Sequence, residues 1–591
     1  MALADAKTRQ GVVIGFLTAQ AGWPSVSAKF ELGHGLMNVR ADSRVARKLA
    51  PGKSIELDTV YLASNENAFT ALEKYGDAVA ALANPRPRTG PTALWCSWYA
   101  HRMAMSEDLV LKNAEVAAKN FKPLGFEIMQ LDHGWQKGDI TGNWVPNERF
   151  PHGLKWLSEE LKNKYGLKLG LWIAPTDVAD TSDLYKQHPD WVLKGGDGKP
   201  LVNWRWYWKP NPNCYELDAS LPAAKSWIEQ TFARLHSEGA SYFKIDFIAS
   251  SAGEQFSPAD PYTTHGWGVL NSAMHAIRAG AGADAWIRYC QPPPLLSVGL
   301  ANSAYGGDDT YDAGVPETMR TLRDNARSLA AGYWINDRLY HREICDMSVR
   351  MQADVEEARL RLAIMALGGC SISFSDELQY LPPSRIRMMQ QVLPPGAPAM
   401  RPIDLWDRSQ PSVWHLHCSN AGRQWEIVGL FNFADREEER TVQFVDVGLP
   451  ADADVAAMEF WESAFAGIHR QKLTMKLAPH TCRVLALSKV TNVPQVVGTD
   501  MQILQGMHDL QDVKWDDQKA TLSGVGRRMP GLLGRVFIHV PAGFDPHFDF
   551  PLRETSAQLT HISGPIWAVE LPFSSATAPW NIPFGRIPPA P

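Results

Sequence analysis

The sequence predicts an α/β protein: a (β/α)8 TIM barrel flanked by a partial N-terminal β-sandwich and C-terminal β-sandwich domains. About 300 central residues alternate between strand, loop and helix patterns, whereas both flanks show only short alternating strands. At 591 residues, the chain is also too long for one hydrophobic core. The predicted domains are residues 1–89, 90–397, 398–490 and 491–591. A doubly wound sheet is the alternative for the central domain.

The first predicted domain, residues 1–89, has strands followed by one helix. Its apolar residues alternate with polar ones in "GVVIGFLT", "SAKFELG" and "SIELDTVYLA". The stretch "NAFTALEKYGDAVAAL" then has the apolar spacing of a helix. Three prolines in "ANPRPRTGP" break regular structure, so a domain boundary is expected near residue 90.

The second domain contains eight candidate strands separated by helices, three of which run through "LVLKNAEVAAKNF", "GLKWLSEELKNKY" and "AAKSWIEQTFARLHSEG". Such alternation calls for parallel strands joined by crossover helices. The strands are expected in "TALWCSWY", "FEIMQLDHGW", "KLGLWIAP", "SYFKIDF", "AWIRYCQ", "LANSAYGGDD", "AAGYWIND" and "GGCSISFSD".

The last two domains are expected to be all β. Residues 398–490 contain "WEIVGLFNF", "RTVQFVDVGL" and "CRVLALSKV", a pattern typical of a β-sandwich. Residues 491–591 contain "ATLSGV" and "GRVFIHVP" between many prolines and glycines, and we interpret them as an ancillary β module.

Composition narrows the function classes. A net charge of -6 argues against nucleic acid or an anionic membrane as the partner. Seven cysteines without a CxxC pair indicate reduced, buried thiols. No signal peptide or transmembrane segment is visible, so a cytoplasmic location is expected if the N-terminus is native. Twenty-two tryptophans are suggestive of sugar binding, because aromatic faces stack on sugar C–H groups.

The chemistry is expected at the C-terminal ends of the barrel strands, where active sites of this fold lie. Carboxylates and tryptophans converging there match a glycosidase, in which one carboxylate attacks the anomeric carbon and another protonates the departing oxygen. The candidate residues are Trp98, Asp132, His133, Trp172, Lys244, Asp246, Cys290, Asp308 and Asp309.

In "SYFKIDFIAS", Lys244 and Asp246 share one face of a strand. Lys244 should favour the ionised form of Asp246, as a nucleophile requires, although a structural Lys–Asp pair is the alternative. Asp308 lies beside Asp309, and repulsion between like charges would keep Asp308 protonated, as an acid requires.

The motifs "LDHGWQ", "GLWIAP", "YFKIDF" and "GGDDTYDA" resemble the strand ends of glycoside hydrolase clan D, nearest to family 36. That family contains α-galactosidases and their raffinose-synthase and seed-imbibition relatives, and the similarity covers about residues 11 to 490. The resemblance implies a retaining mechanism with Asp246 as nucleophile and Asp308 as acid/base, their carboxyl groups roughly 5 to 6 Å apart. It implies no metal and no organic cofactor.

The resemblance also implies that Asp132 and Lys244 hold sugar hydroxyls, while Trp98 and Trp172 shape the pocket wall. His133 departs from the pattern, because typical relatives carry a second aspartate there. For His133, Cys290 and Asp309, structural roles and sugar contacts both stay open.

The predicted function is a retaining, α-galactosidase-like α-glycosidase that acts on a glycoside or oligosaccharide through a covalent aspartyl-glycosyl intermediate. A raffinose-synthase-like transglycosylase and an α-N-acetylgalactosaminidase are close alternatives. A non-catalytic carbohydrate-binding protein on a degenerate barrel is the alternative from another class. Whether the chain forms a homo-oligomer is left open.

Overall fold

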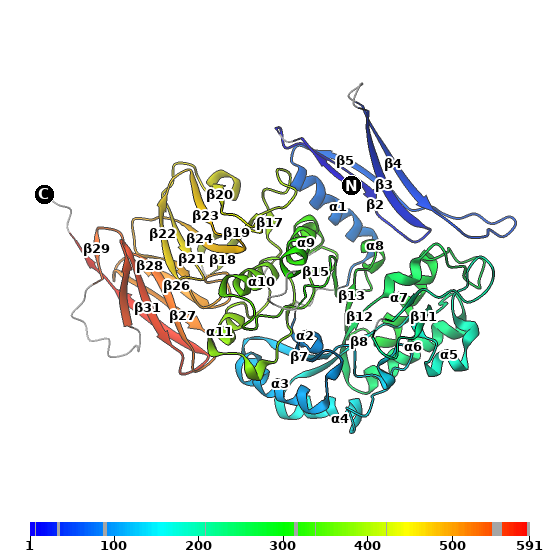
Figure 1. Cartoon of the computed structure of the whole chain (residues 1–591). Helices are drawn as coiled ribbons and strands as arrows, with labels where there is room; N and C mark the ends of the chain where they lie inside the picture. The colour runs from blue at the N-terminus through cyan, green and yellow to red at the C-terminus, as the bar shows by residue number, and fades with distance from the viewer. Residues whose placement is uncertain are drawn as a thin grey trace.

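A parallel, eight-stranded barrel forms the centre of the molecule (Figure 1). The computed structural model describes residues 1–5, 7–31, 36–86, 92–206, 208–311, 317–336, 338–396, 398–420, 422–546 and 558–587. Strands are hydrogen-bonded in the order β15-β14-β13-β12-β8-β7-β6-β16, and a parallel bridge from Met347 to Phe374 closes the ring. This confirms the predicted barrel. Its strands are β6 (Ala93–Cys96), β7 (Phe126–Leu131), β8 (Lys168–Ile173), β12 (Ala240–Ile245), β13 (Trp286–Cys290), β14 (Ser303–Tyr305), β15 (His341–Glu343) and β16 (Ile372–Phe374).

Crossover helices surround this barrel. The Ser106 hydroxyl accepts a hydrogen bond from the Leu109 N–H and so caps the start of α3, the first long helix of the barrel. Gly280 lets α7 approach α6, because a Cβ there would collide with the Glu229 carbonyl. The helices are α2 (Ser97–His101), α3 (Glu107–Asn120), α4 (Gly153–Glu160), α5 (Asp183–Gln187), α6 (Pro222–Ser237), α7 (Trp267–Ala281), α8 (Pro294–Ser297), α9 (Glu317–Ala331), α10 (Val355–Leu367) and α11 (Pro383–Gln391).

The seventh strand lies elsewhere than predicted. The stretch "AAGYWIND" holds the end of α9 and a 3₁₀ turn (Tyr333–Ile335), and strand β15 follows at His341–Glu343. The sequence of this turn resembles a strand because its residues are apolar, but the turn packs against the N-terminal region: the Tyr333 hydroxyl donates a 2.9 Å hydrogen bond to Glu73 in helix α1 (Ala68–Ala83). The end of that prediction, residue 337, and the predicted domain boundaries near residues 90 and 397 fall outside the described residues.

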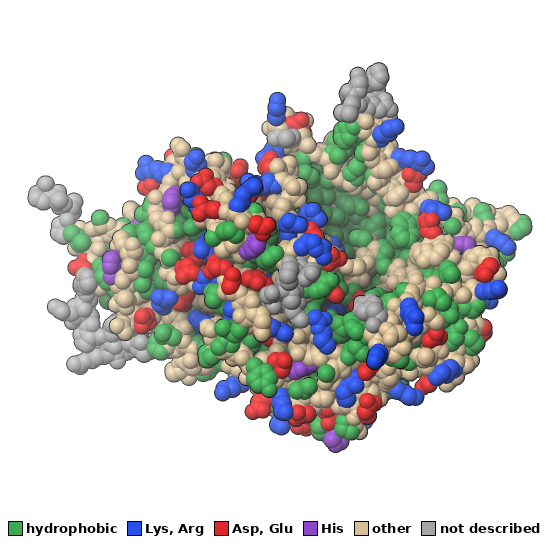
Figure 2. Space-filling model, viewed as in Figure 1, with side chains coloured by type: hydrophobic (Ala, Val, Ile, Leu, Met, Phe, Trp, Pro, Cys, Tyr) green, Lys and Arg blue, Asp and Glu red, His purple; other side chains and the backbone are tan. Residues whose placement is uncertain are grey.

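The N-terminal region forms a three-stranded sheet, in the order β1-β2-β5, and a separate β3-β4 ribbon. Helix α1 (Ala68–Ala83) packs on the sheet, where the Tyr75 hydroxyl donates to the Phe16 carbonyl at 2.7 Å. Figure 2 shows the surface hollowed beside these strands, with hydrophobic side chains in the hollow. The strands are β1 (Ala2–Ala4), β2 (Gly11–Phe16), β3 (Trp23–Glu31), β4 (Leu36–Arg44) and β5 (Val60–Asn65).

Two all-β regions follow the barrel. The first has a six-stranded sheet, β17-β18-β19-β24-β21-β22, and a β20-β23 pair. Its strands are β17 (Arg401–Pro402), β18 (Val413–Asn420), β19 (Arg423–Asn432), β20 (Glu438–Gln443), β21 (Val455–Glu459), β22 (Ala464–His469), β23 (Lys472–Leu477) and β24 (Thr481–Lys489).

The second region has sheets β25-β28-β31-β30 and β26-β27-β32 and a β29-β33 pair. Its strands are β25 (Gln495–Thr499), β26 (Leu510–Asp516), β27 (Thr521–Arg527), β28 (Leu533–His539), β29 (Phe544–Asp545), β30 (Gln558–Ser563), β31 (Ile566–Pro572), β32 (Thr577–Pro583) and β33 (Gly585–Arg586). In the part of the chain that the structure describes, no helix combines the length and hydropathy needed to cross a bilayer.

Candidate active site

Asp246 follows β12 at the C-terminal end of the barrel and is held by two donors. The Trp172 indole Nε1 donates to Asp246 Oδ2 at 3.0 Å, and the Phe247 backbone N–H donates to Asp246 Oδ1 at 2.9 Å. Phe247 has a φ of 52°, a left-handed conformation that turns the chain sharply after the strand. Both carboxylate oxygens are thereby oriented at the barrel mouth.

Lys244 lies at the centre of a buried ion network. Its ammonium is 2.9 Å from Asp132 Oδ2 and 2.9 Å from Asp346 Oδ2, and Arg288 Nη1 binds Asp346 Oδ1 at 2.7 Å. Although burial alone would raise the pKa of Asp346, the charges of Lys244 and Arg288 hold it well below its usual range. Asp132 and Asp346 in turn raise the pKa of Lys244 against the effect of its own burial.

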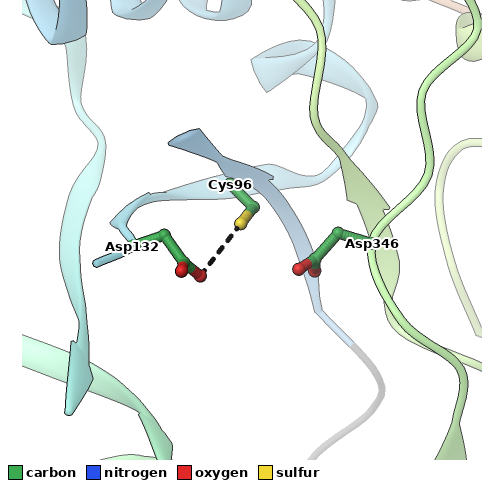
Figure 3. A group of neighbouring side chains, drawn as sticks. All are labelled: Cys96, Asp132 and Asp346. Carbon is green, nitrogen blue, oxygen red and sulfur yellow. Dashed lines mark hydrogen bonds between the residues drawn. The ribbon is translucent and has the colours of Figure 1, made fainter. Parts of the chain in front are cut away.

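Figure 3 shows that Cys96, Asp132 and Asp346 converge in this network. Their donor atoms lie within 4.8 Å of one another and include ligand types found in metal sites. However, the Lys244 ammonium already hydrogen-bonds to both carboxylates, so it supplies the positive charge that a metal would otherwise bring.

The contacts of Lys244 differ from the sequence-based expectation. Its direct partners are Asp132 and Asp346, while Asp246 is bonded by Trp172 and Phe247. Residues two apart on a strand share a face, but they lie about 6 to 7 Å apart along it. Lys244 therefore sits one layer deeper in the barrel than Asp246.

His133 lies beside this network and is neutral. Burial lowers its pKa to about 4. Because Gln136 Oε1 accepts from the Gly134 N–H, the Gln136 amide nitrogen faces His133 Nδ1 at 2.9 Å, which leaves the imidazole proton on Nε2. The ring is surrounded by the indoles of Trp98, Trp172, Trp206 and Trp208 at centroid distances of 6.3, 5.0, 5.0 and 5.9 Å.

Asp308 and Asp309, which follow β14, line one pocket with Asp246. Asp308 is exposed and lies 3.5 Å from Arg320 Nη1. Asp309 accepts a 3.4 Å hydrogen bond from the Cys345 thiol. Asp309 is also exposed as a residue, but partial desolvation of its carboxyl group, together with the negative charge of Asp246, raises its pKa against the opposing charge of Lys244. The pocket encloses about 340 Å³ and is lined by Asp246, Phe247, Ala249, Ser250, Cys290, Gln291, Tyr305, Asp308, Asp309 and Tyr311.

All nine sequence-predicted residues thus lie at one end of the barrel, in two connected groups. Asp246, Cys290, Asp308 and Asp309 line the pocket, while Trp172 bonds Asp246 and contacts the ring of His133. The other group consists of Trp98, Asp132, His133, Trp172 and Lys244.

Sequence reasoning missed two features of the site. Asp346 follows the misplaced seventh strand, so its position at a strand end was not recognised. The second feature is the sheet formed by β9 (Asp177–Ala179), β10 (Trp204–Arg205) and β11 (Asn213–Glu216), which presents Trp204 and Trp206 beside Phe247. The alternation of tryptophan at positions 204, 206 and 208 was the available signal.

Comparisons of the sequence find similarity to α-galactosidases over part of the chain. The Melibiase family model matches residues 84–260. The α-galactosidase AgaA of Geobacillus stearothermophilus is 32% identical over 156 residues, which are 24% of this chain and 20% of that protein. The α-galactosidase Mel36A of Lactobacillus acidophilus is 28% identical over 283 residues, 44% of this chain and 36% of that protein. The matched segments therefore span well under two thirds of these relatives.

Comparisons of the structure cover more of the chain. The α-galactosidase TtGalA of Thermus thermophilus, solved with p-nitrophenyl α-D-galactopyranoside, matches with a TM-score of 0.53 and 25% identity over 66% of this chain and 76% of that one. The GH36 enzyme AgaA matches with a TM-score of 0.56 over 83% of this chain and 69% of that one, but at 17% identity the likeness concerns the fold alone. The chain is thus similar to α-galactosidases in the barrel that carries Asp246.

Proposed function

We propose that the protein is a retaining α-glycosidase of the α-galactosidase type, nearest to family 36. The observation that carries this proposal is the placement of Asp246 in a pocket with a second carboxyl group, at the catalytic end of a barrel similar to those of α-galactosidases. The donors Trp172 and Phe247 hold the Asp246 carboxylate in one orientation, as a nucleophile needs.

In the first step, an Asp246 oxygen attacks the anomeric carbon of a terminal α-linked sugar. The bond from that carbon to the leaving oxygen breaks, and a carboxylic acid in the pocket transfers its proton to this oxygen. A covalent aspartyl-glycosyl intermediate results. In the second step, the same carboxyl group takes a proton from water, whose oxygen displaces Asp246 and restores the enzyme.

Two adjacent residues compete for the role of proton donor. The sequence resemblance favours Asp308. The raised pKa of Asp309, to which the negative charge of Asp246 contributes, favours Asp309. In the variants Asp308→Asn and Asp309→Asn, the true donor is the one whose loss slows glycosides with poor leaving groups far more than nitrophenyl glycosides. General acid catalysis of this kind contributes roughly 10²- to 10⁴-fold.

The experiment that tests the function is hydrolysis of a panel of nitrophenyl α- and β-glycosides, including the galactoside, N-acetylgalactosaminide, glucoside and β-L-arabinopyranoside. We expect release of nitrophenol from one substrate and its near-complete loss in Asp246→Ala. Glu254→Gln, which changes an exposed carboxylate beyond β12, is the matched control and should retain activity. A folded Asp246→Ala protein with normal turnover would refute the proposed mechanism.

A further inference from the structure

A second pair of carboxyl groups lies behind the aromatic residues at the barrel mouth. Asp177 on β9 and Glu216 on β11 are directly opposite each other in the antiparallel register, and both are fully buried. Side chains opposed in this way lie on one face of the sheet within reach of each other. Within the described residues, neither carboxylate forms an ion pair with Lys, Arg or His, so two adjacent buried charges would be uncompensated.

The hydrogen bonds leave one oxygen open on each group. Asp177 Oδ1 accepts from Trp204 Nε1 at 2.8 Å, and Glu216 Oε1 accepts from Asn203 Nδ2 at 2.8 Å. Asp177 Oδ2 and Glu216 Oε2 make no hydrogen bond of good geometry among the described residues, although the hydroxyls of Thr141 and Thr176 lie close enough to Asp177 and Glu216, respectively, to lower their pKa values. A single proton held between the two open oxygens would satisfy both and remove one charge.

We propose that Asp177 and Glu216 share one proton and act as a positioning pair that holds Trp204 beside the nucleophile. The indole of Trp204 lies 5.1 Å from the ring of Phe247, whose N–H donates to Asp246. The path from the pair to Asp246 therefore consists of one hydrogen bond, one ring contact and one further hydrogen bond.

The charges around the pair all favour retention of the proton. Burial raises the pKa of both groups, the negative charge of Asp177 raises that of Glu216, and Asp246 adds to the effect on Asp177. Cys214 also faces Asp177, and burial raises its own pKa, so the thiol stays protonated. The neutral donors Thr141 and Trp204 beside Asp177, and Thr176 and Asn203 beside Glu216, lower these pKa values, but burial has the larger effect. As the pH rises, the folded protein keeps a proton that the unfolded chain releases, and its stability falls accordingly.

The first test counts this proton without using activity. The equilibrium constant for urea unfolding is measured between pH 5 and 7, with tryptophan fluorescence reporting on the barrel. In Asp177→Asn, which keeps an oxygen acceptor for Trp204, the pH dependence should change by one proton, a tenfold difference in that constant per pH unit. Glu216→Gln should do the same and serves if the first variant does not fold. Asp180→Asn, which alters a carboxylate bonded to Asn213 in the same sheet, is the control.

If the pH dependence of the unfolding constant is the same in both variants as in the wild type, Asp177 and Glu216 do not share a proton. A shift of wild-type unfolding with added Ca²⁺ or Mg²⁺ that disappears in Asp177→Asn would overturn the sharing of a proton as well, because the pair would then hold a cation.

The positioning role rests on the proposed glycosidase function and has its own readout. In Asp177→Asn, kcat should persist to higher pH than in the wild type while KM is unchanged, and Trp204→Phe should lower kcat several-fold at every pH. If kcat depends on pH in the same way in the wild type and in Asp177→Asn, the positioning role is refuted. The unfolding experiment then still decides whether Asp177 and Glu216 share a proton. If no glycoside is hydrolysed at all, the proposed function fails, while the unfolding experiment still decides the proton.

Discussion

Replacement of Lys244 by Met would remove the cation at the centre of the buried network while keeping the length of the side chain. Lys244 is only 4% exposed and contacts one oxygen of each of two aspartates at 2.9 Å. After the substitution Asp346 keeps Arg288, but Asp132 keeps only neutral donors from Gln130, Cys96 and the backbone. One buried carboxylate is then left without a cation among the described residues.

Removal of one partner from a buried ion pair costs about 3–5 kcal/mol, so a loss of this size in the free energy of unfolding is expected. Lys244→Met/Asp132→Asn should recover part of it, because the second change removes the uncompensated charge. The assay is urea unfolding of the barrel followed by tryptophan fluorescence at neutral pH.

The control is Lys225→Met on the exposed face of α6, which should change the free energy of unfolding by less than about 0.5 kcal/mol. A loss below about 1 kcal/mol in Lys244→Met, or strict additivity in the double variant, would show that water reaches the network and would refute the reasoning.

Three further results are expected. Trp172→Phe removes the indole donor to Asp246 and should lower kcat by about 10- to 100-fold with KM little changed, as steady-state kinetics on the best glycoside would show. Because burial lowers the pKa of His133 from 6.5 to about 4, its contribution to stability falls by about 3 kcal/mol as the pH drops through that range; unfolding of His133→Asn should lack this component. Gly280→Ala should destabilise the protein by about 1–3 kcal/mol in the same urea assay, since the new methyl group meets the Glu229 carbonyl, and an unchanged midpoint would contradict the close approach of α7 to α6.

The barrel could be predicted because its strands carry local signals. The seven strands other than β15 lie within short, mainly apolar runs, and Asp246 directly follows one of them, β12. The seventh strand could not be found in this way. It is only three residues long, His341–Glu343, and all three of its residues are charged or titratable, whereas the more apolar Tyr333–Ile335 packs on the outside.

The sequence predicted which residues belong to the candidate site, but not which of them contact one another. Sequence spacing places Lys244 and Asp246 on one face, but Lys244 bonds to Asp132, 112 residues earlier in the chain, and to Asp346, 102 residues later. Likewise, the opposition of Asp177 to Glu216 depends on the register of a sheet formed across a long connection. Such contacts are set by tertiary packing, which local patterns do not encode.

The contacts of Lys244 also form in a fixed order during synthesis of the chain, because one of its two aspartate partners is made before it and the other after it. Asp132 precedes Lys244 by 112 residues, so these two residues can form an ion pair once β12 has been synthesised. Asp346 lies 102 residues after Lys244 and has not yet been synthesised at that point. At about 5–20 residues per second, the ribosome needs roughly 5–20 s to supply it. During that interval Arg288 also lacks Asp346, so the buried ion network below the barrel mouth is complete only after Asp346 has been made.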